Sequence, residues 1–182
     1  MLNKIIIAGS GGQGILFLGR ILAFTAAVEG RDVTWFPSYG AEMRGGTANC
    51  TVIISNEMIG SPVVLNPDIL IVMNRISLDK YQPRIKKSGY LFYDSSLISK
   101  PLLRADIKSV PVPATEIAST VSTTKSANMV ILGALIAKTK ILREESLISF
   151  FESSEGPMKK LASRVNIKTV YEGFKYIEDT KS

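Results

Sequence analysis

Histidine is absent from the 182 residues, and cysteine occurs once, at Cys50. The missing histidine excludes a Ser-His-Asp triad, histidine metal ligands and a histidine general base on this chain. A single cysteine forms no internal disulfide and cannot hold a structural zinc ion or an iron–sulfur cluster. We therefore predict no metal site and no catalytic residue, and we expect Cys50 to be a small packed side chain in a strand.

Long apolar runs and blocks of like charge are also missing. The longest apolar stretches, such as residues 129–137, fall well short of the roughly 20 residues that a membrane span needs, and residues 1–4 lead directly into a predicted strand. The net charge of +6 comes from Lys and Arg scattered in ones and twos, without a nucleic-acid-binding motif. We expect one cytoplasmic domain spanning residues 1–182, with no membrane or nucleic-acid partner. A phosphate-bearing small ligand or an acidic protein fits the charge better.

Segments of strand and helix character alternate along the chain, which is typical of a layered α/β domain with a mixed sheet. We predict that the second strand ends at Pro37, and that the third returns through Asn56-Glu57 into residues 58–59 as a hairpin. The expected strands are 4–8, 31–36, 47–55, 68–73 and 90–93, and residues 109–113 are expected to be extended because of their prolines. The expected helices are 14–29, 78–87, 117–121, 128–138, 144–151 and 168–179.

The first glycine motif lies between a predicted strand and a predicted helix. Gly9, Gly11 and Gly14 match the G-x-G-x-x-G spacing of turns that bring a diphosphate close to a helix N-terminus. A dinucleotide site also needs an acidic residue at the end of the second strand, where this chain has Phe36-Pro37-Ser38. Two interpretations stay open: an NAD or FAD phosphate turn, or glycines that let a helix pack closely on the sheet.

Gly12 and Gln13 complete this first motif. The amide of Gln13 both donates and accepts hydrogen bonds. At the first turn of a helix it can bind a phosphate, a ribose or neighbouring backbone.

A second glycine-rich loop occupies residues 37–46, Pro37-Ser38-Tyr39-Gly40-Ala41-Glu42-Met43-Arg44-Gly45-Gly46. Its three glycines allow unusual backbone torsions, and the planar guanidinium of Arg44 suits a phosphate or a carboxylate. The alternative is a local ion pair between Glu42 and Arg44 on a solvated turn, with Tyr39 at the edge of the core.

Together the two glycine motifs resemble, in order and spacing, the gamma subunit of the 2-oxoacid:ferredoxin oxidoreductases. The resemblance covers roughly residues 4–137, and the sequence of residues 37–46 is most like that of the 2-oxoglutarate type. It also rests on Ile53-Ile54-Ser55, Ser61-Pro62, Asp68-Ile69-Leu70, Asn128-Met129-Val130 and Leu132-Gly133-Ala134.

This resemblance implies a three-layer α/β/α domain with a mixed, Rossmann-like sheet. It implies a non-catalytic subunit of an enzyme that oxidatively decarboxylates a 2-oxoacid, such as 2-oxoglutarate or pyruvate, to an acyl-CoA and passes electrons to ferredoxin. Thiamine diphosphate, Mg and iron–sulfur clusters would belong to partner alpha, beta and delta-type subunits, and the gamma subunit would contribute to coenzyme A binding and assembly.

The residues that the resemblance marks as candidates for the coenzyme A site are Gly9, Gly11, Gly12, Gln13, Gly14, Tyr39, Gly40, Glu42, Arg44, Gly45, Gly46 and Asn128. Two other functions remain open: a free-standing dinucleotide-binding oxidoreductase, and a purely structural subunit whose glycine loops fit against its partners.

Overall fold

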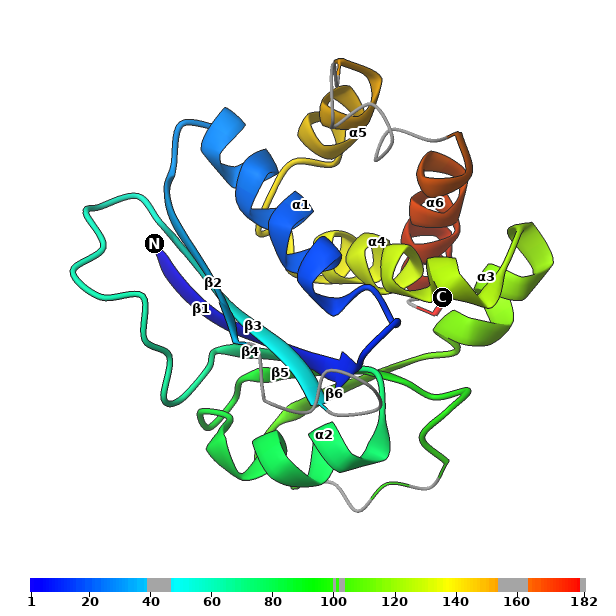
Figure 1. The fold of residues 1–182 in the computed structure, drawn as a ribbon, viewed down its shortest axis with the longest axis horizontal. Helices are drawn as coiled ribbons and strands as arrows, with labels where there is room; N and C mark the ends of the chain where they lie inside the picture. The colour runs from blue at the N-terminus through cyan, green and yellow to red at the C-terminus, as the bar shows by residue number, and fades with distance from the viewer. Residues whose placement is uncertain (39–46, 100, 102–103, 154–163, 181–182) are drawn as a thin grey trace.

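The computed structural model describes residues 1–38, 47–99, 101, 104–153 and 164–180. It contains a six-stranded sheet in the order β2-β3-β1-β4-β5-β6, with helices on both faces (Figure 1). The strands are β1 (Leu2–Ser10), β2 (Asp32–Ser38), β3 (Thr47–Ser55), β4 (Ile69–Val72), β5 (Tyr90–Asp94) and β6 (Lys108–Val112). The helices are α1 (Ile15–Val28), α2 (Arg75–Tyr81), α3 (Ala114–Val121), α4 (Ala127–Thr139), α5 (Glu144–Ser153) and α6 (Arg164–Asp179), with 3-10 turns η1 (Gln82–Arg84) and η2 (Thr124–Ser126).

The sheet is mixed. Strands β1, β4, β5 and β6 run parallel to one another, whereas β3 lies antiparallel between β1 and β2. In this register Ile7 is opposite Cys50 of β3 on one side and Ile71 of β4 on the other. Alternate residues of each strand face opposite sides of the sheet, so the apolar strands supply two cores.

The two cores form a three-layer α/β/α domain, as the sequence predicts. Ile5 and Ile7 pack into the larger core, which includes side chains from α1, α3, α4, α5 and α6. Ile6 and Ala8 face the smaller core, which includes Leu78 of α2. Figure 1 shows α2 alone on its side of the sheet. Among the described helices, α2 thus covers this face without a helical neighbour.

The predicted hairpin at the end of the third strand is wrong. Strand β3 already pairs with β1 on one side and β2 on the other, so neither edge is available to a returning strand. Residues 58–59 form no strand, and residues 57–63 line a hollow with residues of β1 and β3. The strand that is next to β3 in the sequence and also pairs with it is β2, which comes before β3.

Two predicted boundaries also change. Strand β2 continues through Pro37 to Ser38, because an edge strand tolerates a residue without an N–H. The helix predicted over 78–87 begins earlier, where the side chain of Asn74 accepts a hydrogen bond from the Ser77 N–H. It ends at Tyr81, before the 3-10 turn that contains Pro83.

Candidate functional site

The carboxyl ends of β1 and β4 lie side by side at a point where the chain diverges. After β1 the chain enters α1 on one face of the sheet, and after β4 it enters α2 on the other face (Figure 1). Ligands of open α/β sheets bind at such divergence points. A hollow of about 270 Å³ is lined here by Gly12, Gln13, Met73, Leu97, Thr115, Thr124, Lys125 and Ala127.

The side chain of Gln13 joins the ends of the two strands. Its Oε1 accepts a hydrogen bond from the Ser10 N–H at 2.6 Å, and its Nε2 donates to the Met73 carbonyl at 2.8 Å. The Asn74 amide donates to Ser10 Oγ at 2.6 Å while its oxygen caps α2. A phosphate, a ribose and backbone groups were the partners considered for the Gln13 amide, and in the structure it bonds to the backbone of Ser10 and Met73.

The glycines of the first motif have different physical roles. A Cβ at Gly9 would lie 2.6 Å from Ile15 Cδ1 and 2.7 Å from Gln13 Oε1, so a side chain there would have to displace both of these side chains. Gly12 and Gly14 have φ of +93° and +70°, and a Cβ on Gly14 would clash with the Asn128 amide. Around Gly12 there is open space, and both Gly11 and Gly12 are exposed.

Asn128 supports the turn from α4. Its side chain is 3% exposed, and its Nδ2 donates to the Gly14 carbonyl at 3.1 Å. The same carbonyl accepts from the Leu18 N–H at 2.9 Å in the first turn of α1. Asn128 therefore fixes the position at which α1 begins.

The opposite wall of the hollow comes from the segments that follow β5 and α3. Asp94, fully buried at the end of β5, accepts hydrogen bonds from Thr115 Oγ1 at 2.5 Å and from the Thr115 N–H at 3.3 Å. Lys125, in η2, is exposed and makes no ion pair with any residue that the structure describes. This ammonium gives the hollow a positive charge.

Sequence reasoning missed Thr115, Thr124 and Lys125. They lie more than 100 residues after the glycine turn and belong to no recognised motif. A usable signal was the predicted extended segment before Thr115, whose carboxyl end reaches this edge if it forms a parallel strand of the sheet.

The second glycine loop begins and ends at this same edge. Ser38 ends β2, and Thr47 begins β3 opposite Ser10, the last residue of β1. The candidate residues Tyr39, Gly40, Glu42, Arg44, Gly45 and Gly46 lie outside the described residues.

Cys50 behaves as a packed side chain, as expected. It is fully buried, and its Sγ donates a weak hydrogen bond to the Ile15 carbonyl at 3.7 Å. Burial raises the pKa of the thiol to about 12, against a smaller opposing effect of the Trp35 indole. Such a thiol is protonated at neutral pH and is a poor nucleophile.

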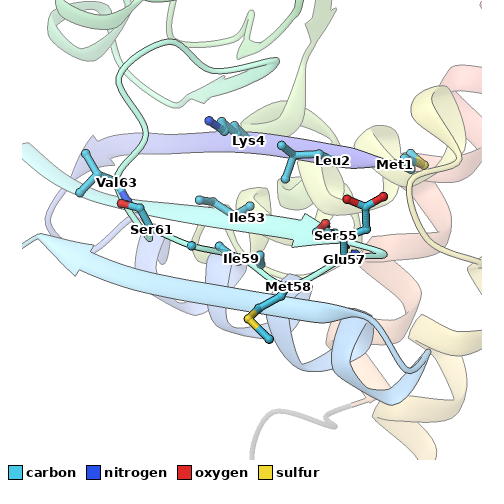
Figure 2. A pocket seen from close by; sticks show the side chains of 11 residues that line it. Met1, Leu2, Lys4, Ile53, Ser55, Glu57, Met58, Ile59, Ser61 and Val63 are labelled. Carbon is cyan, nitrogen blue, oxygen red and sulfur yellow. Dashed lines mark hydrogen bonds between the residues drawn. The ribbon is translucent and has the colours of Figure 1, made fainter.

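A second hollow, of about 290 Å³, lies on the face shared with α2, between the start of β1, the end of β3 and residues 57–63 (Figure 2). The strand β1 separates Leu2, which lines this hollow, from Ser10 by about 26 Å at the usual rise per residue. None of the predicted site residues that the structure describes lines it. The glycine turn and this hollow are therefore distinct places on the molecule.

The sheet order argues against a dinucleotide site of the usual kind. In that fold the second strand lies next to the first, which brings its acidic residue to the ribose. Here β3 separates β2 from β1, and Asp32 lies at the opposite end of β2. Within the described ranges no group of three His, Cys, Asp or Glu side chains could hold a metal ion, and no helix is long and apolar enough to cross a membrane.

Residues 4–176 match the family model described as pyruvate ferredoxin/flavodoxin oxidoreductase. The chain belongs to this family. It is 43% identical over 134 residues to the ketoisovalerate oxidoreductase subunit VorA of Methanothermobacter thermautotrophicus, covering 74% of this chain and 28% of that protein. It is 38% identical over 150 residues to the 2-oxoglutarate synthase subunit KorC of Methanocaldococcus jannaschii, covering 81% and 80%. The resemblance found in the two glycine motifs is thereby confirmed.

Solved structures agree with the fold. The gamma subunit of a keto/oxoacid ferredoxin oxidoreductase from Geobacter sulfurreducens has a TM-score of 0.81 at 28% identity, covering 97% of this chain and 99% of that one. The 2-oxoglutarate:ferredoxin oxidoreductase of Magnetococcus marinus, determined with 2-oxoglutarate, coenzyme A and succinyl-CoA bound, has a TM-score of 0.83 at 26% identity. This chain spans 30% of the length of that protein, just as it spans about a quarter of VorA.

Proposed function

We propose that this chain is the gamma-type, non-catalytic subunit of a multisubunit 2-oxoacid:ferredoxin oxidoreductase and helps to bind coenzyme A. The observation that carries the proposal is the match to KorC, which covers about four-fifths of both chains. The enzyme would oxidise a 2-oxoacid to its acyl-CoA in the cytoplasm.

The other cofactors of such an enzyme belong, in this proposal, to alpha, beta and delta-type partner subunits. A cysteine-held iron–sulfur cluster does not fit this chain, because its one cysteine is buried and it has no histidine. Thiamine diphosphate, Mg and the clusters would be carried by the partners, and ferredoxin would receive the electrons there.

The hollow at the glycine turn suits the phosphates of coenzyme A. The first N–H groups of α1 have no partner within the helix, and the N-cap residue Gly14 has no side chain to cap them. Together with the helix dipole they favour an anion, which the exposed backbone at Gly11 and Gly12 allows to approach closely. The ammonium of Lys125 would add a charge-assisted hydrogen bond, and Arg44 is the proposed second cation.

The proposed substrate is 2-oxoglutarate. The 2-oxoglutarate synthase subunits KorC, matched over most of their length, are 34–38% identical to this chain. The gamma subunits common to pyruvate and ketoisovalerate oxidoreductases are matched over 79% of their length at 30% identity, and the VorA match covers a small part of a ketoisovalerate enzyme. Comparing turnover of 2-oxoglutarate, pyruvate and 2-ketoisovalerate by the assembled enzyme tests this choice directly. A preference for either of the other two acids would reject it.

The coenzyme A site is tested in the assembled enzyme by the variants Lys125→Ala and Arg44→Ala. Each should raise the KM for coenzyme A about tenfold or more, since a hydrogen bond to a charged group contributes about 1.5–3 kcal/mol. The KM for the 2-oxoacid should stay the same. The matched control is Lys138→Ala, which removes an exposed lysine near the other end of α4. Unchanged coenzyme A dependence in both variants would remove the ligand site from this subunit.

A further inference from the structure

The two edges of the sheet differ in how they are closed. At the β6 edge, Pro111 has no N–H, and its carbonyl accepts a hydrogen bond from the Tyr176 hydroxyl of α6 at 3.0 Å. At the β2 edge, no hydrogen bond from any described residue reaches the outward backbone groups. Within the described sheet, strand β2 therefore presents an unpaired edge.

The backbone hydrogen bonds alternate in direction along each strand, and this alternation shows which β2 residues point their N–H and C=O groups away from β3. The Asn56 N–H donates to the Met1 carbonyl, so in β3 the even-numbered residues bond toward β1 and the odd-numbered ones toward β2. The β2 partners of those odd-numbered residues are the even-numbered positions 32 to 38. Val33, Trp35 and Pro37 consequently point their N–H and C=O groups away from the sheet, Pro37 offering a carbonyl only.

Most of the usual protection against strand addition is missing from this edge. Natural edge strands carry charges, prolines, bulges or short lengths that prevent pairing with another chain. Residues 33–37 of β2, Val-Thr-Trp-Phe-Pro, contain no charge and are rich in residues that favour strands. Phe36, on the face shared with α2, is 54% exposed. Only Pro37, at the end of the segment, limits the pairing.

We infer that β2 pairs antiparallel with β2 of a second copy of this chain, about a two-fold axis normal to the sheet at Trp35. In this register Trp35 exchanges two N–H···O=C bonds with Trp35 of the second copy, and each Val33 N–H donates to the Pro37 carbonyl across the axis. Such isologous contacts are the commonest way for identical chains to associate. The two sheets then become one continuous sheet.

Side-chain pairing selects this register. Residues directly opposite each other in an antiparallel pair point to the same face. With the axis at Trp35, Thr34 lies opposite Phe36, a favourable β-branched and aromatic pair, and Asp32 lies opposite Ser38. A shift of two residues, which centres the axis on Thr34, would place the Asp32 carboxylate opposite Phe36. The inference uses only the strand and its sequence, and it is independent of the proposed function.

The oligomeric state of the full chain tests the inference. Sedimentation equilibrium should show a dimer at micromolar concentration. Val33→Pro removes an outward N–H without touching the inward bonds, and Phe36→Lys places charge at the contact, so each should raise the dimer dissociation constant at least tenfold. The control Ile76→Lys, at an apolar side chain of α2 that is 68% exposed, should leave the dimer intact. Circular dichroism verifies that each variant is folded.

Disulfide formation tests the register. The Thr34→Cys, Phe36→Cys double variant should form a covalent dimer on oxidation, because opposite residues that are not hydrogen-bonded have the Cα separation of a disulfide. Each single variant should stay uncrosslinked, and Cys50 is buried. A chain that is monomeric at every concentration, or a dimer that survives both Val33→Pro and Phe36→Lys, would overturn the inference. A monomer whose Phe36→Lys variant no longer co-purifies with partner subunits would assign the edge to one of them and overturn it equally.

Discussion

Cys50 shows how closely the helix-bearing face of the sheet is packed at the level of single atoms. A Cβ on Gly19 of α1 would lie 2.5 Å from the Cys50 sulfur and 3.2 Å from Trp35 Nε1. The glycine thus allows α1 to lie directly on the thiol and the indole. Water is excluded from the sulfur, which is the reason that its pKa rises.

This raised pKa predicts a loss of stability at alkaline pH. The unfolded chain releases the thiol proton near pH 9.0, whereas the folded chain keeps it until about pH 12. The stabilising effect is therefore complete below pH 9 and lost between these values, by up to about 1.4 kcal/mol per pH unit. Urea unfolding at pH 8.5, 9.5 and 10.5 should show a steeper fall in unfolding free energy for the native chain than for Cys50→Ala. Equal slopes would mean that the thiol ionises in the folded protein as it does in water.

Side-chain contacts between residues far apart in the chain could not be predicted from the sequence. The motif placed Gln13 at the turn, yet its partner, the Met73 carbonyl, lies 60 residues away, and no local pattern predicts that contact. Lys125 was missed for the same reason, since the hollow that it lines forms only when α3 and α4 pack beside the turn. The glycine spacing, by contrast, reflects backbone torsions and was predictable.

At the scale of whole elements, the close approach of α4 and α6 depends on two glycines. A Cβ on Gly133 would meet the Val170 carbonyl oxygen, and a Cβ on Gly173 would meet the Val130 carbonyl oxygen. Each glycine faces the backbone of the other helix, so neither contact can be relieved by a change of side-chain rotamer. These two positions bring the terminal helix onto the core.

Replacing either glycine should destabilise the protein although alanine is the better helix former. Alanine gains up to about 1 kcal/mol in helix propensity, but the forced separation of the helices costs about 1–3 kcal/mol or more. Gly133→Ala and Gly173→Ala should both lower the urea midpoint, and the double variant should lose less than the sum because both widen one contact. The control is Lys138→Ala on the exposed side of α4. An increase in stability in either glycine variant would show that the helices separate without cost.

The elements themselves were largely predictable because their patterns are local. The apolar spacing of residues 14–29 and the runs at 4–8, 68–73 and 90–93 each predicted an element that the structure contains. The hairpin at 58–59 failed because a turn signal does not specify which strand becomes the neighbour. The pairing of β3 with β1 joins residues 37 to 53 positions apart, and only the assembled sheet decides it.

For the whole molecule, the structure offers a physical feature that suits the proposed subunit role. Leu2, Phe36, Met58 and Val63 are each more than half exposed, and they line hollows on the face of the sheet that carries α2. Met58, at 92%, projects from the segment that crosses this face (Figure 2). Exposed apolar side chains gathered on one face are typical of proteins that bind partners.

The final prediction concerns what the purified chain does by itself. It should contain no iron and should reduce no redox dye with any 2-oxoacid, because one buried thiol and no histidine provide neither cluster ligands nor the usual general base. Adding the alpha, beta and delta-type subunits should restore dye reduction that depends on coenzyme A, while those subunits without this chain should show a weaker dependence. Metal analysis and the dye assay measure both parts. Stoichiometric iron or turnover in the lone chain would contradict the proposal that the partner subunits carry the cofactors and this chain is not catalytic. The chemistry would then require ligands that this sequence does not have.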